Sequence, residues 1–343
     1  MGRQYLSSIG KIDNGVVSVG SLWADERVYY PLEVEPYTPA HHFEGGKEDP
    51  RFRTKPQIAL DLVEAALEGG IPFRAVVGDI LYGEHRKFKK GLENRQIPYV
   101  LAIKPSYAWY RPIGEPGTVE EVAQLAPWEG PDDPGEWVKL SRTFRDGHTE
   151  EWWALEAECR PFGKEKQRRL VVATTDPAEL PKRTTWYLLT NLPAPDSLRA
   201  TESELIPAEV AEVVRLYSLR SWIEQSYKQV KNSLGWAHYQ VRSDTAIRRH
   251  WQLVCCAFTF CWWANADLLE EEAPPGVVLE EGVASTSASM AERGKKEDRK
   301  PASSVLARGT KEGEDVAGAV RNAVAILEGV LREAPAQGTA KAA

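Results

Sequence analysis

The stretch from Tyr217 to Lys231 constrains this chain most, because it places charged groups on one face of a helix. It contains neither Gly nor Pro. At about 100° per residue, Tyr217, Arg220, Glu224 and Lys231 fall within about 60° of one another, and Lys228 lies on the same face. One carboxylate therefore shares its face with three cations and a phenol.

This face has two interpretations. The first is a solvated surface with ion pairs from Arg220 to Glu224 and from Glu224 to Lys228, each worth about 0.2–0.5 kcal/mol. The second is a metal-binding carboxylate flanked by cations that hold phosphates. Spacing alone favours the first, so the choice depends on whether the chain supplies further acids.

Asp79 is a second candidate acid, because it ends a short apolar strand at residues 74–79. A helix at 55–68, a basic helix at 84–94 and a strand at 98–104 surround it. Strand, helix and strand within about 30 residues predict a parallel βαβ unit, and such sheets bind ligands where strands end. Asp79 is equally suited to cap the helix that follows it.

The pattern Tyr-x2-Arg-x3-Glu-x6-Lys, formed by Tyr217, Arg220, Glu224 and Lys231, resembles the motif of a large group of insertion-sequence DDE transposases. The segment Gly78-Asp79-Ile-Leu-Tyr-Gly83 resembles the region of their second catalytic Asp. The resemblance covers about residues 3–265. It implies an α/β, RNase H-like mixed sheet flanked by helices, with a β-rich insertion.

The resemblance also implies roles for single residues. Asp79 and Glu224 would be catalytic and would bind two Mg²⁺ (or Mn²⁺) ions for DNA cleavage and strand transfer. Arg220, Lys228 and Lys231 would hold DNA phosphates, and Tyr217 would lie near the transposon end. The implied partners are the transposon ends and target as double-stranded DNA, bound by a homodimer in the cytoplasm at the nucleoid.

The N-terminal region departs from the family pattern. Arg3-Gln4-Tyr5 resembles the segment that follows the strand with the first catalytic Asp, and no acid precedes it. We therefore expect a chain truncated at its N-terminus, with weak or no activity. Asp13 is the nearest substitute, but Asp13-Asn14-Gly15 is a turn sequence. A non-catalytic remnant that binds transposon ends, a housekeeping RNase H-like nuclease and a purely structural role for the acids remain alternatives.

Four segments follow from composition and pattern. Residues 1–104 are the first part of the core, with a hairpin of strands at 15–24 and 28–34 in which Pro31 marks an edge or a bulge. Residues 105–205 are the β-rich insertion. Residues 206–270 hold one helix at 206–234 and a second at about 244–269. Residues 271–343 are a low-complexity, disordered tail with a short amphipathic helix at 315–333.

The net charge of −7 disfavours a nucleic-acid partner unless positive charge is segregated. Clusters that could together follow phosphates are Arg86-Lys87/Lys89-Lys90, Lys164/Lys166/Arg168-Arg169, Lys182-Arg183 and Arg242/Arg248-Arg249. The four Cys form no metal or disulfide pattern, and Cys255, Cys256 and Cys261 are predicted core residues. The apolar run at 253–269 is too short and too interrupted to cross a bilayer, so no membrane partner is expected.

Overall fold

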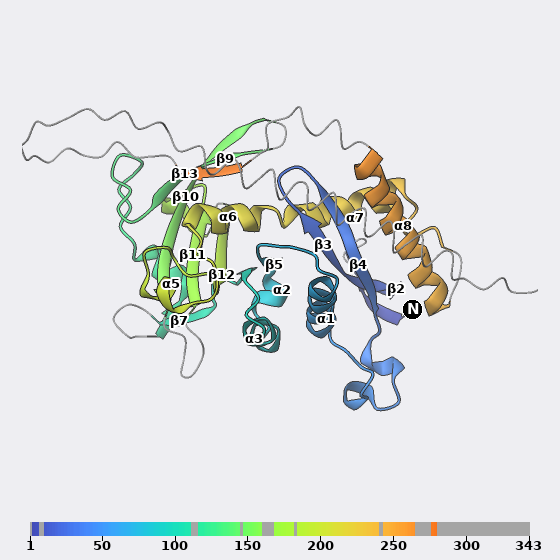
Figure 1. Ribbon diagram of the computed structural model, residues 1–343. Helices are drawn as coiled ribbons and strands as arrows, with labels where there is room; N and C mark the ends of the chain where they lie inside the picture. Colours follow the sequence, from blue (N-terminus) through green and yellow to red (C-terminus); the bar gives the residue numbers. More distant parts are fainter. Residues whose placement is uncertain are drawn as a thin grey trace, which may run out of the picture. The chain divides into compact units, whose positions relative to one another are not determined.

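The protein is described here from a computed structural model, shown in Figure 1. The structure describes residues 2–6, 10–110, 116–144, 147–159, 168–181, 184–239, 243–264 and 276–279. Residues 1–282 form one compact unit, and a second unit at 283–343 lies outside the described residues. The predicted helix at 315–333 belongs to that undescribed part.

Two hairpins open the chain. Strand β1 (Gly2–Leu6) pairs with β2 (Lys11–Gly15), and β3 (Val17–Ala24) pairs with β4 (Tyr29–Tyr37). The register shifts between Ser21 and Leu22, opposite Pro31, which confirms the predicted irregularity. The predicted turn at residues 13–15 is wrong, because these residues pair with β1 and so lie inside β2.

The predicted βαβ unit is present. Helix α1 (Lys55–Glu68) has the predicted bounds and begins with a capping box between Thr54 and Gln57. Strands β5 (Val76–Gly78) and β6 (Tyr99–Ala102) are parallel, and α2 (Ile80–Gly83) and α3 (Arg86–Asn94) connect them. The loop before α1 holds two short 3-10 helices, η1 (Ala40–His42) and η2 (Gly46–Glu48).

The β-rich segment extends the same sheet rather than forming a separate one. Its long strands are β9 (Val138–Thr143), β10 (Thr149–Cys159), β11 (Arg168–Thr174) and β12 (Thr185–Thr190). They give a mixed seven-stranded sheet in the order β13-β9-β10-β11-β12-β6-β5. Strand β13 (Gly276–Leu279) lies within the predicted disordered tail and instead pairs with β9. The smaller elements are β7 (Ala108–Tyr110), β8 (Pro116–Thr118), α4 (Val119–Gln124), η3 (Pro177–Glu179) and α5 (Leu198–Glu202).

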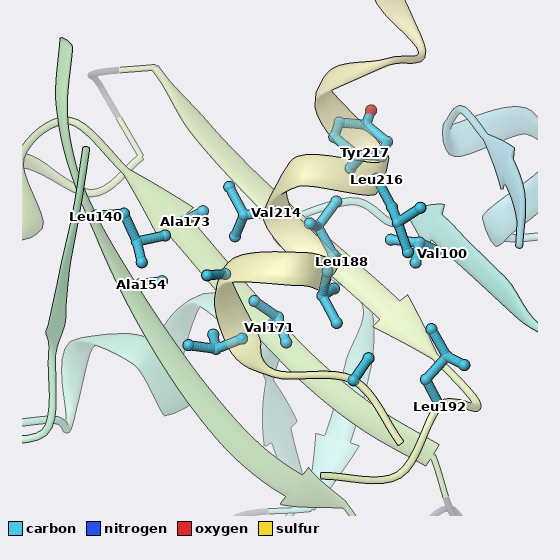
Figure 2. Close-up of a cluster of buried hydrophobic side chains, with 14 of the residues drawn as sticks. Val100, Leu140, Ala154, Val171, Ala173, Leu188, Leu192, Val214, Leu216 and Tyr217 are labelled. Carbon is cyan, nitrogen blue, oxygen red and sulfur yellow. The ribbon is translucent and has the colours of Figure 1, made fainter. Parts of the chain in front are cut away.

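Both faces of this sheet are covered, so its central strands are apolar on both sides. In β11, Val171 faces the cluster that contains α6 (Val210–Ser218), whereas Val172 belongs to the cluster that contains α4. Figure 2 shows α6 lying across the strands with its apolar side chains facing them. Val210, Val214 and Tyr217 recur at helical spacing in that cluster.

The single helix predicted at 206–234 is wrong, because two helices occupy this range. Helix α6 ends at Ser218, and α7 runs from Ser221 to Ser233. At the junction, Arg220 donates its N–H to the Tyr217 carbonyl and Ile223 donates to the Arg220 carbonyl. These bonds span three residues instead of four and tighten the backbone locally. The next helix, α8 (Asp244–Ala264), matches its prediction as far as the described residues extend.

These elements confirm the predicted fold class, a mixed α/β sheet flanked by helices as in RNase H-like proteins. No helix of the described residues is long and apolar enough to cross a membrane. Within α8, Cys255 is buried as predicted, but Cys261 is exposed.

Gly83→Ala tests the packing of α2 on β6. A Cβ at Gly83 would collide with the Ala102 carbonyl oxygen, so the fixed backbone would have to shift. We expect a loss of about 1–3 kcal/mol in the free energy of unfolding, measured by chemical denaturation. Leu81→Ala, at an exposed position of the same helix, should change stability by less than about 0.5 kcal/mol. Equal stability of Gly83→Ala and the unsubstituted chain would contradict this packing.

Candidate functional site

Asp79 lies where β5 ends and α2 begins, and its two carboxylate oxygens have different surroundings. Oδ1 accepts the Leu81 backbone N–H at 2.9 Å and caps α2. Oδ2 lies 3.9 Å from Nη2 of Arg220. Capping and a place in the site were rival interpretations of the sequence, and the structure gives Asp79 both positions.

Glu224 reaches the same guanidinium from the first turn of α7. Its Oε1 lies 2.6 Å from Nη2 of Arg220. One nitrogen therefore contacts both acids, and the two oxygens are separated by no more than the two distances added together. Two metal ions in phosphoryl-transfer sites lie about 3.5–4 Å apart, so the acids are close enough to share such a pair.

The break between the helices sets the place of Arg220. The residue keeps right-handed helical dihedral angles, with φ −56° and ψ −31°, but it belongs to neither helix. Tyr217 and Glu224 lie on either side of the break. The ion pair that was predicted from the four-residue spacing of Arg220 and Glu224 still forms next to the break, as their contact shows.

Tyr217 joins the core to the acids. Its ring is buried in the cluster around α6 and meets Trp186 edge-on, with ring centroids 5.0 Å apart. Figure 2 shows its hydroxyl pointing away from the apolar side chains. Burial raises the pKa of Tyr217, nearby Asp79 and Glu224 raise it further, and Arg220 opposes them. The hydroxyl therefore shares its electrostatic surroundings with all three charged residues.

The two predicted lysines do not join the acids. Lys228 is exposed, and within the described residues it forms no ion pair with Glu224, so that predicted bridge is absent. Lys231 is also exposed, and its Nζ lies 5.6 Å from the centre of the Tyr227 ring. Both side chains remain open to solvent one or two turns beyond Glu224.

The structure removes three cations from the basic surface that the clusters were expected to form, because Lys89, Arg168 and Arg169 are paired inside the protein. Lys89 is buried, and its Nζ donates to the Gly83 carbonyl at 2.6 Å. Arg168 pairs with Glu93 at 2.7 Å, with both side chains buried. Arg169 is buried and pairs with Glu156. The predicted cations at 164, 166, 182, 183 and 242 lie outside the described residues.

Exposed cations do remain at parts of these clusters. Arg86, Lys87, Lys90 and Arg249 have exposed side chains. Arg248 is half-buried and pairs with Glu35 and Asp244. Asp13, considered above as a substitute acid, forms a local pair with Lys11 at 3.2 Å. A structural role for Asp13 is in keeping with that contact.

Comparisons with known proteins identify the family of this chain. The sequence pattern of the DDE superfamily endonucleases matches residues 1–156. The probable transposase for insertion sequence element IS701 from Microchaete diplosiphon is 32% identical over 240 residues, which is 70% of this chain. The chain is a relative of the insertion-sequence DDE transposases. It spans 54% of the length of that curated relative.

Two tyrosines near the site were not identified as functional residues from the sequence. Tyr82 lies next to Asp79, and burial, then Asp79 and Tyr227, raise its pKa. Tyr227 is nearly buried, and its hydroxyl lies close to Gly20 of β3. Tyr82 belongs to the Gly78–Gly83 segment that resembles the transposases, which was the available clue. Nothing in the sequence indicated that Tyr227 lies against β3.

The acids of this DDE transposase relative suit a hard divalent cation. Carboxylate oxygens are the ligands that Mg²⁺ prefers. The Asp79 and Glu224 side chains are 43% and 67% exposed, so a hydrated ion can reach them. Among the described residues, however, no group of three or more His, Cys, Asp or Glu side chains could hold a metal. The described site therefore offers two carboxylates, one phenol and one cation.

The pKa of Tyr217 tests whether the four side chains meet. Asp79→Asn and Glu224→Gln should each lower this pKa, because each removes a negative charge that disfavours the tyrosinate. Arg220→Gln should raise it. The titration can be followed by NMR of ¹³C-labelled tyrosine, with Tyr217→Phe to assign the resonance. An unchanged pKa in all three variants would mean that the acids lie far from the hydroxyl.

Proposed function

We propose that this chain supplies two acids, Asp79 and Glu224, to a divalent-metal site that cleaves and joins DNA during transposition. The observation that carries the proposal is the contact of one Arg220 nitrogen with both carboxylates, at 2.6 and 3.9 Å. The acids come from elements 145 positions apart in the sequence, so no local helix rule accounts for their meeting.

The reaction displaces an oxygen at phosphorus in line with the attacking oxygen. Bound Mg²⁺ or Mn²⁺ would stabilise the charge on both oxygens. Asp79 and Glu224 would hold the ions, and Asp79 can do so with Oδ2 while Oδ1 continues to cap α2. Arg220 would turn from the carboxylates to a DNA phosphate, because its guanidinium pairs well with either group.

The proposed substrate is double-stranded DNA at the transposon ends and target. Lys228 and Lys231 are exposed beyond Glu224 and would bind phosphates on either side of the reacting one. Tyr217 would hold the DNA end against the acids with its hydroxyl. We also propose a homodimer on DNA, since two ends must be brought together, acting at the nucleoid in the cytoplasm.

A complete site of this kind would need a further acid, since the described residues bring only two acids together. The chain by itself should then bind metal weakly and react slowly. This consideration gives weight to a second function, that of a non-catalytic protein that binds transposon ends. Only the catalytic function requires metal-dependent cleavage, whereas both functions require DNA binding.

Cleavage of duplex DNA carrying insertion-sequence ends tests the catalytic proposal. With Mg²⁺ or Mn²⁺, we expect little or no strand transfer by the 343-residue chain. Residual metal-dependent nicking should disappear in Asp79→Asn and Glu224→Gln, because each change removes an ionic ligand. Asp13→Ala is the control and should leave nicking unchanged.

Three other outcomes are informative. Strong cleavage that survives Asp13→Ala but not Asp79→Asn would show that another acid completes the site. Cleavage of generic DNA or RNA without preference for the ends would favour a housekeeping nuclease. Nicking that persists in both Asp79→Asn and Glu224→Gln would refute the proposed roles of these acids.

The salt dependence of DNA binding tests the two lysines. Lys228→Ala and Lys231→Ala should each weaken binding and lower the steepness of log K against log salt by about 0.9, since each removes about one phosphate contact. Fluorescence anisotropy at several salt concentrations measures this slope. Lys47→Ala, an equally exposed lysine on η2, is the matched control. The role fails if all three variants give the same slope.

A further inference from the structure

A cavity opens between the first turns of α1 and α3, apart from the acids of the candidate site. Its volume is about 220 Å³, and its lining residues are Thr54, Gln57, His85, Arg86 and Lys87. A water molecule needs only about 10–15 Å³, so a larger ligand can enter. Within the described part of the chain no acid lines the cavity, and the adjoining acid, Glu84, pairs with Lys104. A ligand there would meet cations and no unpaired carboxylate.

Close packing of α1 against α3 supports the walls of this cavity. Leu60 and Val63 of α1 belong to one apolar cluster with Phe88 and Leu92 of α3. Gly91 makes the close approach possible, since a Cβ there would collide with the Leu60 side chain. Figure 1 shows the two helices as neighbours. The cavity is therefore bordered by two elements that the core holds together.

The cap of α1 fixes the orientation of the Gln57 amide. Oε1 of Gln57 accepts the Thr54 backbone N–H and the Thr54 hydroxyl, each at 2.8 Å. Because a backbone N–H can donate only to the amide oxygen, the NH₂ group of Gln57 points away from the cap. The backbone N–H of Gln57 is itself bonded to the Thr54 hydroxyl. Gln57 therefore presents two side-chain N–H donors beyond the cap.

The cap of α3 orients His85 in a similar way. Its Nδ1 accepts the Phe88 backbone N–H at 3.2 Å, so the neutral ring carries its proton on Nε2 and donates from there. Burial lowers the pKa of His85, and the nearby cations Lys87 and Lys89 lower it further. Arg86 and Lys87 have exposed side chains. The cavity thus offers side-chain donors and positive charge, whereas the backbone N–H groups of both caps are already bonded.

We propose that this cavity binds one backbone phosphate of the DNA, separate from the phosphate that reacts at the acids. Phosphate oxygens accept from N–H donors, and their charge pairs with Arg86 and Lys87. The choice of DNA rests on the proposed function, since a phosphate ion in solution has the same chemistry. Such a contact would position the DNA without reading its sequence.

The place of the cavity in the chain suggests which phosphate it holds. Asp79 follows β5, α2 makes one turn, and His85 caps α3 six positions after Asp79. Six residues of helical backbone advance about 9 Å. One strand of DNA advances about 3.4 Å per nucleotide. The phosphate in the cavity would therefore lie about three nucleotides from the reacting one.

Gln57→Glu tests the cavity without disturbing the cap. A Glu side chain can still accept the Thr54 N–H, so the melting temperature should not fall. It replaces the two donors with a negative oxygen, which should weaken duplex DNA binding about tenfold in fluorescence anisotropy. Gln252→Glu, the same change at an exposed position of α8, is the matched control and should bind DNA as the unsubstituted chain does.

A double variant, Arg86→Gln with Lys87→Gln, tests whether one phosphate is held. Because both cations would hold the same phosphate, the steepness of log K against log salt should fall by about 0.9. Two separate phosphates on an open surface would lower it by about 1.8. Lys90→Gln, at an exposed position one turn further along α3 and outside the cavity, should leave the slope unchanged.

The pKa of His85 reports occupation of the cavity directly. A bound phosphate should raise it, because a nearby anion favours the imidazolium. Histidine NMR during titration with inorganic phosphate, and separately with duplex DNA, measures this pKa against chloride at equal ionic strength. His85→Asn assigns the resonance, since Asn also caps a helix. Gln57→Glu should abolish the rise that phosphate causes.

Several results would overturn the proposal. Equal DNA affinity of Gln57→Glu and Gln252→Glu would show that the cavity does not contact DNA, and a His85 pKa that rises only with inorganic phosphate would assign it to a phosphate compound in solution. An unchanged slope in the double variant, a fall of about 1.8, or an equal fall in Lys90→Gln would rule out a single held phosphate. These measurements do not use cleavage, so they stand even if Asp79 and Glu224 prove not to be catalytic.

Discussion

The arrangement of the site depends on one guanidinium held between two carboxylates. Two carboxylates that lie this close repel each other unless a positive charge lies between them. Arg220 supplies that charge through a single nitrogen that contacts both Asp79 and Glu224. Both acid side chains are exposed, and carboxylate oxygens are the ligands that hard divalent cations prefer. A cation released from the pair would be available to a phosphate.

The apolar core beneath the site holds this cluster in place. Helix α6 packs across the strands through a stripe that ends in Tyr217, whose ring is buried and whose pKa is influenced by Arg220 and both acids. The tightened turn then begins, so Arg220 follows directly from a fixed point. On the other side, β5 is anchored by its parallel pairing with β6 and delivers Asp79 at its end. Two rigid elements therefore meet at side chains that are themselves exposed.

The distribution of cations changes the significance of the net charge. Clusters of Lys and Arg suggested a surface that follows DNA, yet Lys89, Arg168 and Arg169 are buried with partners of their own. Each buried cation needs a carbonyl or a carboxylate, because an unpaired charge in the interior is very costly. The exposed positive charge that could meet DNA is therefore smaller than a count of basic residues indicates, and it includes Lys228 and Lys231.

The sequence by itself determined what depends on neighbours in the chain. Helix α1 followed from Pro56 in its first turn and the glycines that end it, the parallel pair from two apolar runs, and the contact of Arg220 with Glu224 from four-residue spacing. It did not determine the break between α6 and α7, the strand at 13–15 or the burial of Arg168, because distant partners decide each of them. That Asp79 and Glu224 would lie close together was implied by family resemblance, and the tertiary structure brings both to Arg220. The physical reason is that periodicity acts over a few residues, whereas pairing and burial join groups far apart in the chain.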